Sequence, residues 1–109
     1  MEHEIREQGD VLIAVLSGDI DLEQAPAARK VLLECVGQGK SVLVDLSGVG
    51  YIDSSGVASL VEAYQAARKT KSGFALVSVS VGAMRVLELA RLNKVFTIHD
   101  TIEAGLEAS

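Results

Sequence analysis

Residues 41–57 read SVLVDLSGVGYIDSSGV, a stretch in which one apolar strand leads through a short connection into a helix. The first six residues, 41–46, are nearly all apolar, and valines stand at positions 42 and 44. Strands that are covered on both faces have this pattern, and such strands are usually parallel to their neighbours. Two glycines in residues 47–50 indicate a connection, and a long amphipathic helix is expected to begin near Ser54. The stretch therefore predicts a strand–helix unit of a layered α/β fold.

The residues before this stretch predict a hairpin, a loop and a helix. Residues 3–8 alternate weakly, Gly9-Asp10 is typical of a turn, and residues 11–16 are strongly apolar. A loop is expected at residues 18–21, which read GDID. Pro26 then falls in the first turn of a helix, where its missing N–H costs little. The inner face of this helix is expected to carry Leu22, Ala25, Leu32, Cys35 and Val36.

The residues after the stretch alternate between helix and strand patterns. The helix that begins near Ser54 is expected to stop at Ser72-Gly73, and its buried stripe holds Val57, Leu60, Val61, Tyr64 and Ala67. The elements expected after it are a strand at 74–79, a helix at 81–92 closed by Asn93 in the left-handed conformation, a strand at 95–98, and a helix capped by Thr101 that runs to about Ala108.

This order of elements predicts one α/β domain that spans residues 1–109. Its sheet is expected to be mixed but mostly parallel, with the N-terminal hairpin as the antiparallel part and with helices flanking the sheet. A chain of 109 residues has room for one core only, and its 49% of hydrophobic residues is too high for a disordered protein.

Composition excludes several classes of function. The net charge of −5 argues against binding to nucleic acid, which requires a basic face. The charged N-terminus is unlike a signal peptide, and no apolar stretch approaches the ~20 residues that span a bilayer. We therefore expect a cytoplasmic protein without membrane insertion. No residues have metal-ligand or cofactor spacing, and the single cysteine, Cys35, is expected in the core.

The sequence around Asp53 offers the clearest candidate site. Asp53, Ser54 and Ser55 place a carboxylate and two hydroxyls where a helix begins, and Gly56 leaves room for close approach. The first backbone amides of a helix are unpaired and carry a partial positive charge. Asp53 or Ser54 could act as the N-cap, which contributes about 1 kcal/mol. Alternatively, one serine is phosphorylated, because the helix dipole tolerates an anion there.

Three landmarks resemble the STAS domains of bacterial anti-sigma factor antagonists. The segment Asp53-Ser54-Ser55-Gly56 after an apolar strand resembles the signature of that family, and Gly18-Asp19-Ile20-Asp21 is similar to its Gly-Glu-Leu-Asp turn. Residues 87–104 contain a pattern similar to the closing helix–strand–helix of the family. The likeness extends from about Val11 to Ala104.

The resemblance implies a switch protein and not an enzyme. In the family, the unmodified domain binds an anti-sigma factor that is also a serine kinase, which frees the sigma factor, and a serine phosphatase reverses the phosphorylation. By position, the phosphorylated residue is Ser54. Asp21 and Asp53 would flank it and, with Ser55 and Gly56, would form the partner-binding surface.

The family also suggests an alternative role. Some STAS domains are docking subunits of lipid-transporting ABC systems, but these often lack paired serines, so Ser54 and Ser55 favour the sigma pathway. The chain has Ala90-Arg91-Leu92 where the family commonly has Ser-Gly-Leu. A hydrolase is disfavoured because no nucleophile, base and orienting group converge. His99 and Asp100, for example, are adjacent residues on an expected strand and therefore point to opposite faces, so Asp100 is poorly placed to orient His99.

Overall fold

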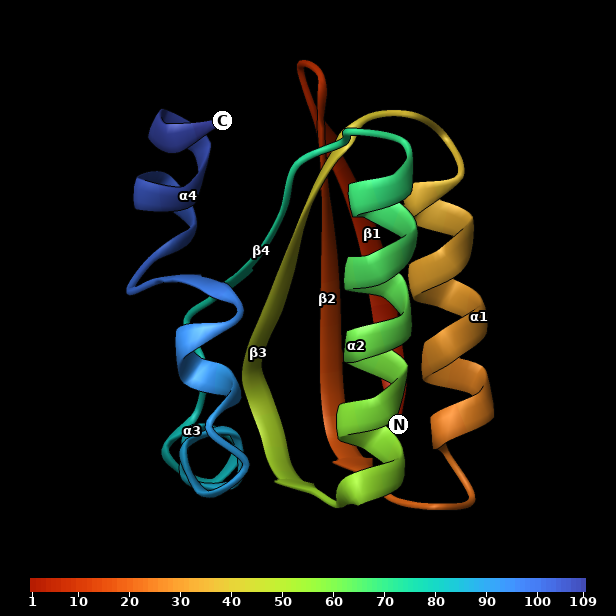
Figure 1. Cartoon of the computed structure of the whole chain (residues 1–109), viewed down its shortest axis with the longest axis vertical. Coiled ribbons are helices and arrows are strands. Elements are labelled where there is room, and N and C mark those ends of the chain that lie inside the picture. Colours follow the sequence, from red (N-terminus) through yellow and green to blue (C-terminus); the bar gives the residue numbers. More distant parts are fainter.

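A five-stranded sheet with the order β1-β2-β3-β4-β5 forms the centre of the molecule (Figure 1). The computed structural model describes all residues, 1–109. β1 is antiparallel to β2, and β2, β3, β4 and β5 are parallel to one another. The strands are β1 (Glu2–Gln8), β2 (Val11–Ile20), β3 (Ser41–Ile52), β4 (Phe74–Val77) and β5 (Thr97–His99). The expected single α/β domain, with a mostly parallel sheet and an N-terminal hairpin, is confirmed.

Helices cover the two faces of the sheet unequally. Three helices pack against one face, and they are α1 (Ala25–Val36), α2 (Ser54–Lys69) and α3 (Val81–Leu89). The short helix α4 (Ile102–Ala108) lies on the other face, and a 3₁₀ turn (Leu92–Lys94) joins α3 to β5. None of these helices combines the length and the apolar character needed to cross a membrane.

Alternation along β2 supplies both cores. Leu12, Ala14 and Leu16 belong to the larger core under the three helices, whereas Val11 and Ile13 belong to the smaller core on the α4 side. This follows from the two-residue period of a strand, which sends successive side chains to opposite faces. A strand buried on both faces is therefore apolar along its length, as the sequence indicates for β2 and β3.

A hydrogen bond joins α1 to α2, and an aromatic cluster packs α2 against β4 and the residue before β5. The buried Ser59 hydroxyl of α2 donates to the backbone oxygen of Ala25 at 3.1 Å, where α1 begins. Three of the four aromatic residues form one cluster, in which the ring centroids of Tyr64 and Phe96 lie 5.4 Å apart and those of Tyr64 and Phe74 lie 6.2 Å apart. The fourth aromatic residue, Tyr51, lies outside this cluster and is exposed.

Gly105 sets the distance of α4 from the sheet. A Cβ atom at this position would lie 2.9 Å from Cγ1 of Val77 and 3.0 Å from Cδ1 of Leu43. The glycine therefore allows a close approach that a larger residue would prevent, and α4 has the Thr101 cap and the end at Ala108 that the sequence predicts.

Three expectations for the residues before β3 and within it are wrong. Residues 18–20 continue β2, and residues 47–50 continue β3, because the two strands pair as far as Ile20 with Ile52. Register shifts along this pairing accommodate residues that have no partner on the opposite strand. These irregularities interrupt the strand pattern in the sequence, so that the segments resemble loops. Leu22 is 71% exposed and lies outside α1, which begins at Ala25.

The boundaries after β4 also differ from those expected. β4 ends at Val77, and Ser78 has φ of 52°. α3 ends at Leu89, and the left-handed residue is Arg91, with φ of 60°, where Asn93 was expected. The last strand is Thr97–His99, two residues later than its expected start, because the 3₁₀ turn occupies part of the connection.

Cys35 provides a test of the core. Its side chain is buried, and burial, together with the nearby Glu34 carboxylate, raises the pKa of the thiol. Because the thiolate is the reactive species, we expect Cys35 to resist labelling by an aromatic disulfide reagent near pH 8 until the chain is unfolded. As a matched control, a cysteine introduced by Gln8→Cys on the exposed strand β1 should label at once. Equal labelling rates for the two thiols would contradict this core.

Candidate functional site

The carboxyl ends of β2 and β3 converge on the start of α2. Asp19 pairs with Tyr51 and Ile20 with Ile52, the last pair of the ladder. The amide of Asp53 then donates to the backbone oxygen of Ile20 at 3.3 Å, which holds the strand-to-helix connection against β2. Ligand and partner sites in α/β proteins commonly lie at the carboxyl ends of parallel strands.

Asp53 is the N-cap of α2. Its Oδ1 accepts from the amide of Ser55 at 2.9 Å and from the amide of Gly56 at 3.1 Å, and its backbone is extended. The structure thus chooses Asp53 and not Ser54 as the cap. Ser54 is the first residue of the helix and is exposed, whereas Ser55 is half-buried.

Asp21 plays the corresponding part at the approach to α1. Its Oδ1 accepts from the amides of Glu23 and Gln24, both at 3.1 Å. Because Asp21 follows Ile20 directly and Asp53 bonds to Ile20, the two carboxylates belong to neighbouring connections. The expectation that Asp21 and Asp53 lie in the same region as Ser54 agrees with this geometry.

Gly56 permits the first turn of α2 to touch the ends of both strands. A Cβ atom at Gly56 would lie 2.6 Å from the backbone oxygen of Ile20 and 2.6 Å from Cγ1 of Ile52. Real Cβ atoms essentially never approach other heavy atoms so closely. The close approach that the sequence suggests for Gly56 is therefore made to the protein's own backbone, and this contact fixes where Ser54 projects.

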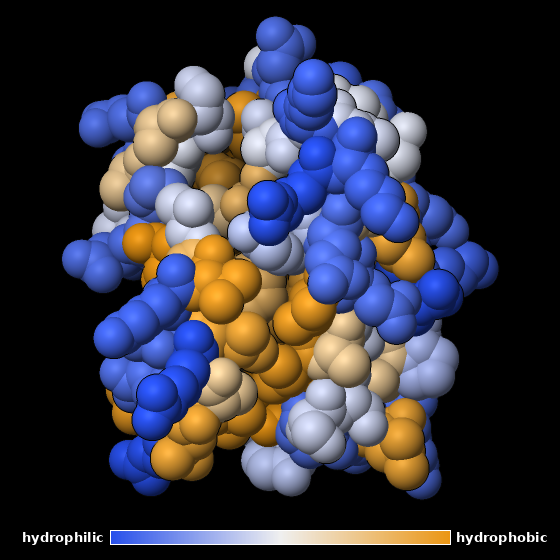
Figure 2. Space-filling view, viewed as in Figure 1, coloured by the Kyte–Doolittle hydropathy of each residue, from blue (hydrophilic) through white to orange (hydrophobic).

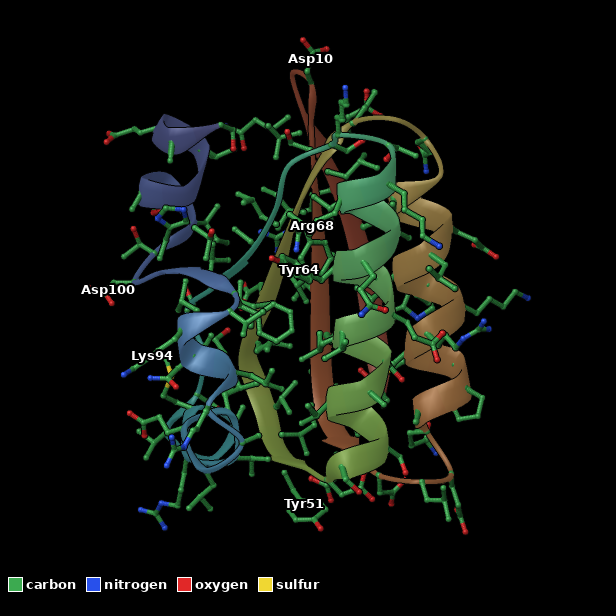
Figure 3. All side chains as sticks on the ribbon, in the orientation of Figure 1. Asp10, Tyr51, Tyr64, Arg68, Lys94 and Asp100 are labelled. Carbon is green, nitrogen blue, oxygen red and sulfur yellow. The ribbon has the colours of Figure 1, made fainter.

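Three exposed apolar side chains lie on the segments that meet at this end of the molecule, and the sequence did not reveal them. Leu22, Tyr51 and Val81 are 71%, 52% and 78% exposed. Figure 3 shows Tyr51 at the end of the molecule where α2 begins. Val81 is held nearby because the hydroxyl of Ser80 donates to the backbone oxygen of Val49 at 2.6 Å. We name Leu22, Tyr51 and Val81 the apolar rim.

The surface beside the rim is also apolar, and the strand ends add acidic groups. Figure 2 shows hydrophobic side chains gathered between α2 and α3 on the face that carries the helices. Asp19 and Glu23 are exposed at this end, and the half-buried Asp21 and Asp53 add two further carboxylates. Monomeric proteins rarely leave contiguous apolar surface uncovered without a role, so this end of the molecule has the character of a protein-binding surface.

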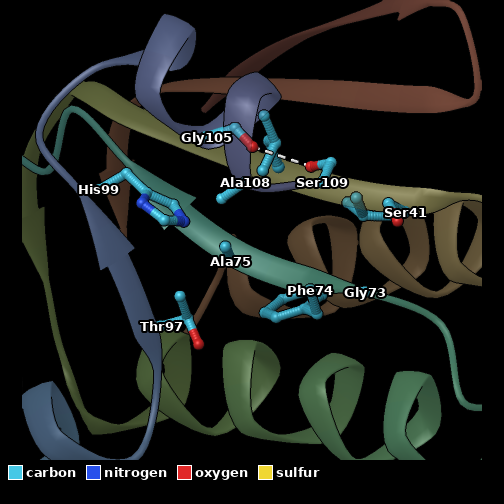
Figure 4. Close-up of a pocket in the computed structure, with 11 residues that line it drawn as sticks. Ser41, Gly73, Phe74, Ala75, Thr97, His99, Gly105, Ala108 and Ser109 are labelled. Atoms are coloured by element: carbon cyan, nitrogen blue, oxygen red, sulfur yellow. Dashed lines mark hydrogen bonds between the residues drawn. The ribbon is translucent and has the colours of Figure 1, made fainter.

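The hollow in the structure lies elsewhere. It occupies about 200 Å³ between α4 and the sheet and is lined in part by Ser41, His99, Gly105 and Ser109 (Figure 4). This volume is below the roughly 300–1,000 Å³ of small-molecule sites. No group of three His, Cys, Asp or Glu side chains has the arrangement to hold a metal ion. The polar residues expected to form the switch and the partner-binding surface, which are Asp21, Asp53, Ser54 and Ser55, lie at the Ser54 end and do not line this hollow.

Comparison with known proteins places the chain in a family. The STAS domain model matches residues 2–105, and the chain therefore belongs to the STAS domain family. It is 26% identical over 92 residues to the anti-sigma-B factor antagonist of Bacillus subtilis (strain 168), which covers 84% of each chain. It is 30% identical over 97 residues to the anti-sigma-B factor antagonist of Listeria monocytogenes, covering 87% of this chain and 85% of that protein.

A solved structure agrees with this assignment. The crystal structure of an anti-sigma factor antagonist from Mycobacterium paratuberculosis superposes with a TM-score of 0.89 at 27% identity, and the match covers 98% of this chain and 92% of that chain. The resemblance inferred from the three sequence landmarks is therefore confirmed at the level of family and fold.

Gly56→Ala tests the contact between α2 and the strand ends. The added Cβ must displace backbone of Ile20, so we expect a loss of at least about 1 kcal/mol in the free energy of unfolding, measured by urea denaturation. Gly50→Ala is the matched control, because its Cβ would meet only Oδ1 of Asp19 at 3.6 Å. A Gly56→Ala variant as stable as Gly50→Ala would show that the approach is looser than described.

Asp53→Ala tests the cap. Removing the carboxylate frees the amides of Ser55 and Gly56, and we expect a loss of about 1 kcal/mol in unfolding free energy. Asp53→Asn keeps an acceptor oxygen and should retain most of the stability. Asp10→Ala, in the exposed turn between β1 and β2, removes a carboxylate without a cap and serves as control. Equal effects at positions 53 and 10 would argue against capping.

Proposed function

We propose that this protein is an anti-sigma factor antagonist whose binding surface is the Ser54 end, and that phosphorylation of Ser54 prevents binding. The observation that carries the proposal is an exposed serine at the start of a capped helix, at the same end of the molecule as the apolar rim. The names of the relatives, which describe antagonists of anti-sigma factors, support the same role.

The geometry favours Ser54 over Ser55 as the acceptor. Ser54 is exposed, and its hydroxyl makes no hydrogen bond within the chain. Ser55 is half-buried, and its backbone oxygen accepts from the hydroxyl of Ser59 at 3.2 Å. A kinase must reach the hydroxyl of its substrate residue, so access at the surface selects Ser54.

A phosphate on Ser54 would keep its negative charge uncompensated at the surface. The amides of Ser55 and Gly56, which could bind an anion at the helix start, already donate to Asp53. The neighbouring carboxylates of Asp21 and Asp53 add further negative charge. Phosphorylation adds nearly two charges and three strongly hydrated oxygens.

The apolar rim explains why that charge would oppose binding. A partner that covers Leu22, Tyr51 and Val81 would also remove water from Ser54, which is exposed at the same end of the molecule. Burying a charged group without a counter-charge is far more costly than burying a hydroxyl. The modification therefore acts as a switch through desolvation, repulsion and size, and no rearrangement of the fold is required.

The partners follow from this role. The first is an anti-sigma factor that is also a serine kinase, which binds the unmodified protein and phosphorylates it. The second is a serine phosphatase, which restores the hydroxyl and the binding surface. In this scheme the protein itself has no catalytic step, and its work is to occupy the anti-sigma factor.

Mass spectrometry after incubation with the cognate kinase and ATP tests the acceptor. We expect one phosphate on Ser54 in the wild-type protein and in Ser55→Ala, and none in Ser54→Ala. Phosphate on Ser55 in the wild-type protein would refute the assignment.

Calorimetric titration with the same kinase tests the switch. Ser54→Ala should bind like the unmodified protein, and Ser54→Asp should bind about tenfold or more weakly, because it buries a charge. Ser55→Ala is the matched control for loss of a hydroxyl. Affinity purification from the native host separates the alternative role, since recovery of a transporter ATPase in place of an anti-sigma factor would contradict the proposal.

A further inference from the structure

The edge strand β1 is long and uncovered. All seven of its residues, Glu2–Gln8, are exposed, and one side of the strand pairs with β2 while the other has no neighbour in the sheet order. Such an edge presents unpaired backbone amides and carbonyls and is a template for a further strand. Its central residue, Ile5, is 41% exposed and is the one large hydrophobic side chain among charged and polar ones.

We propose that β1 pairs antiparallel with β1 of a second copy of this chain, about a two-fold axis at Ile5, so that two five-stranded sheets become one continuous sheet. This interface is separate from the Ser54 end and does not depend on the proposed function. The occupant is a second copy because this register opposes no like charges and pairs Glu4 with Arg6, whereas each neighbouring register opposes two like charges.

The pairing can be read from the strand itself. With the axis at Ile5, Glu4 lies opposite the partner's Arg6, His3 opposite the partner's Glu7, and Glu2 opposite the partner's Gln8. Each cross-strand pair then joins an acid to a base or to a polar group, and Ile5 meets the partner's Ile5. Opposite charges and apolar pairs placed directly across two strands stabilise a sheet, whereas like charges destabilise it.

Other registers fail on the same criterion. Residues that lie directly opposite each other must point to the same face of the sheet. The two-fold axis must therefore pass through a residue, and the neighbouring registers have their axis at Glu4 or at Arg6. An axis at Glu4 places two glutamates opposite each other, and an axis at Arg6 places two arginines opposite each other. Ile5 is also the midpoint of Glu2–Gln8, so only an axis at Ile5 allows all seven residues of the strand to pair.

The charges of β1 are already ordered within one chain. Arg6 Nε donates to Glu4 Oε2 at 2.8 Å on one face of the strand, and this hydrogen bond lowers the pKa of Glu4. Glu7, on the other face, pairs with Lys40. In the pair of strands, Glu4 and Arg6 of both copies form a four-charge cluster of alternating sign. On the opposite face of the sheet, which carries His3 and Glu7, the two Ile5 side chains lie against each other.

Charge exchange tests both the interface and its register. Sedimentation of the wild-type protein should give twice the monomer mass of 11.5 kDa at high concentration. Glu4→Arg and Arg6→Glu each place like charges opposite one another, and each should raise the dimer dissociation constant about tenfold or more. The double variant Glu4→Arg, Arg6→Glu restores alternating charge and should restore the dimer.

Arg85→Glu, on the exposed surface of α3, is the matched control, since it changes the net charge as Arg6→Glu does and should leave the dimer intact. Circular dichroism establishes that each variant is folded. A wild-type chain that is monomeric up to millimolar concentration, or a double variant no better than the single ones, overturns the proposal.

A disulfide locates the axis independently. Ile5→Cys places two cysteines directly across the axis, where Cβ atoms are about 4.5–5.5 Å apart, so mild oxidation should give a covalent dimer. Gln8→Cys is the control, because its two copies would be six residues, or roughly 20 Å, apart along the strands. The native Cys35 is buried and does not compete. Equal cross-linking by the two variants would contradict an axis at Ile5.

Discussion

The contact of Gly56 with Ile20 and Ile52 is the constraint on which the arrangement of this molecule depends. A helix can begin so close to two strand ends only because no side chain stands between them, and the amide of Asp53 bonds to the same carbonyl of Ile20. The strand-to-helix connection is consequently one residue long. Ser54 is held at the surface by backbone contacts and not by its own side chain, which leaves the hydroxyl free.

Much of this arrangement can be predicted from local sequence signals. The apolar strands β2 and β3, a cap at Asp53 or Ser54, and the order of strands and helices each have a pattern that operates over a few residues, and the structure then assigns the cap to Asp53. The choice of Ser54 as the candidate acceptor comes from the family likeness, because the residues alone indicate only that one of the two serines could be phosphorylated. The sequence therefore predicts the structure correctly where it depends on local signals such as helix capping and strand alternation.

The sequence predictions are wrong where contacts between residues far apart in the chain determine the local structure. Residues 47–50 carry two glycines and resemble a loop, but pairing with β2 keeps them in a strand through register shifts that no local pattern shows. Leu22 fits the spacing of a helical face, yet the turn made by Asp21 delays the helix to Ala25 and leaves the leucine exposed. Tyr51 and Val81 could not be assigned to the surface because an apolar residue is ordinarily expected in a core.

The two surfaces described for this chain lie in different places and have different chemistry. The Ser54 end combines acidic groups with an apolar rim, whereas the β1 edge is mainly polar and relies on backbone pairing. In an antiparallel pair of β1 strands, the two sheets run in opposite directions. Their Ser54 ends would then face away from each other, and each could hold a partner without obstructing its counterpart.

The cap at Asp53 has a further effect on how modification would be detected. Since one carboxylate oxygen already accepts from the amides of Ser55 and Gly56, an added phosphoryl group would find neither of these two amides free and would not need to break either bond. The melting temperature would accordingly change little, and a dye-based thermal assay would scarcely distinguish the modified form from the unmodified one. Separation by charge, as in isoelectric focusing or native electrophoresis, would resolve the two forms directly.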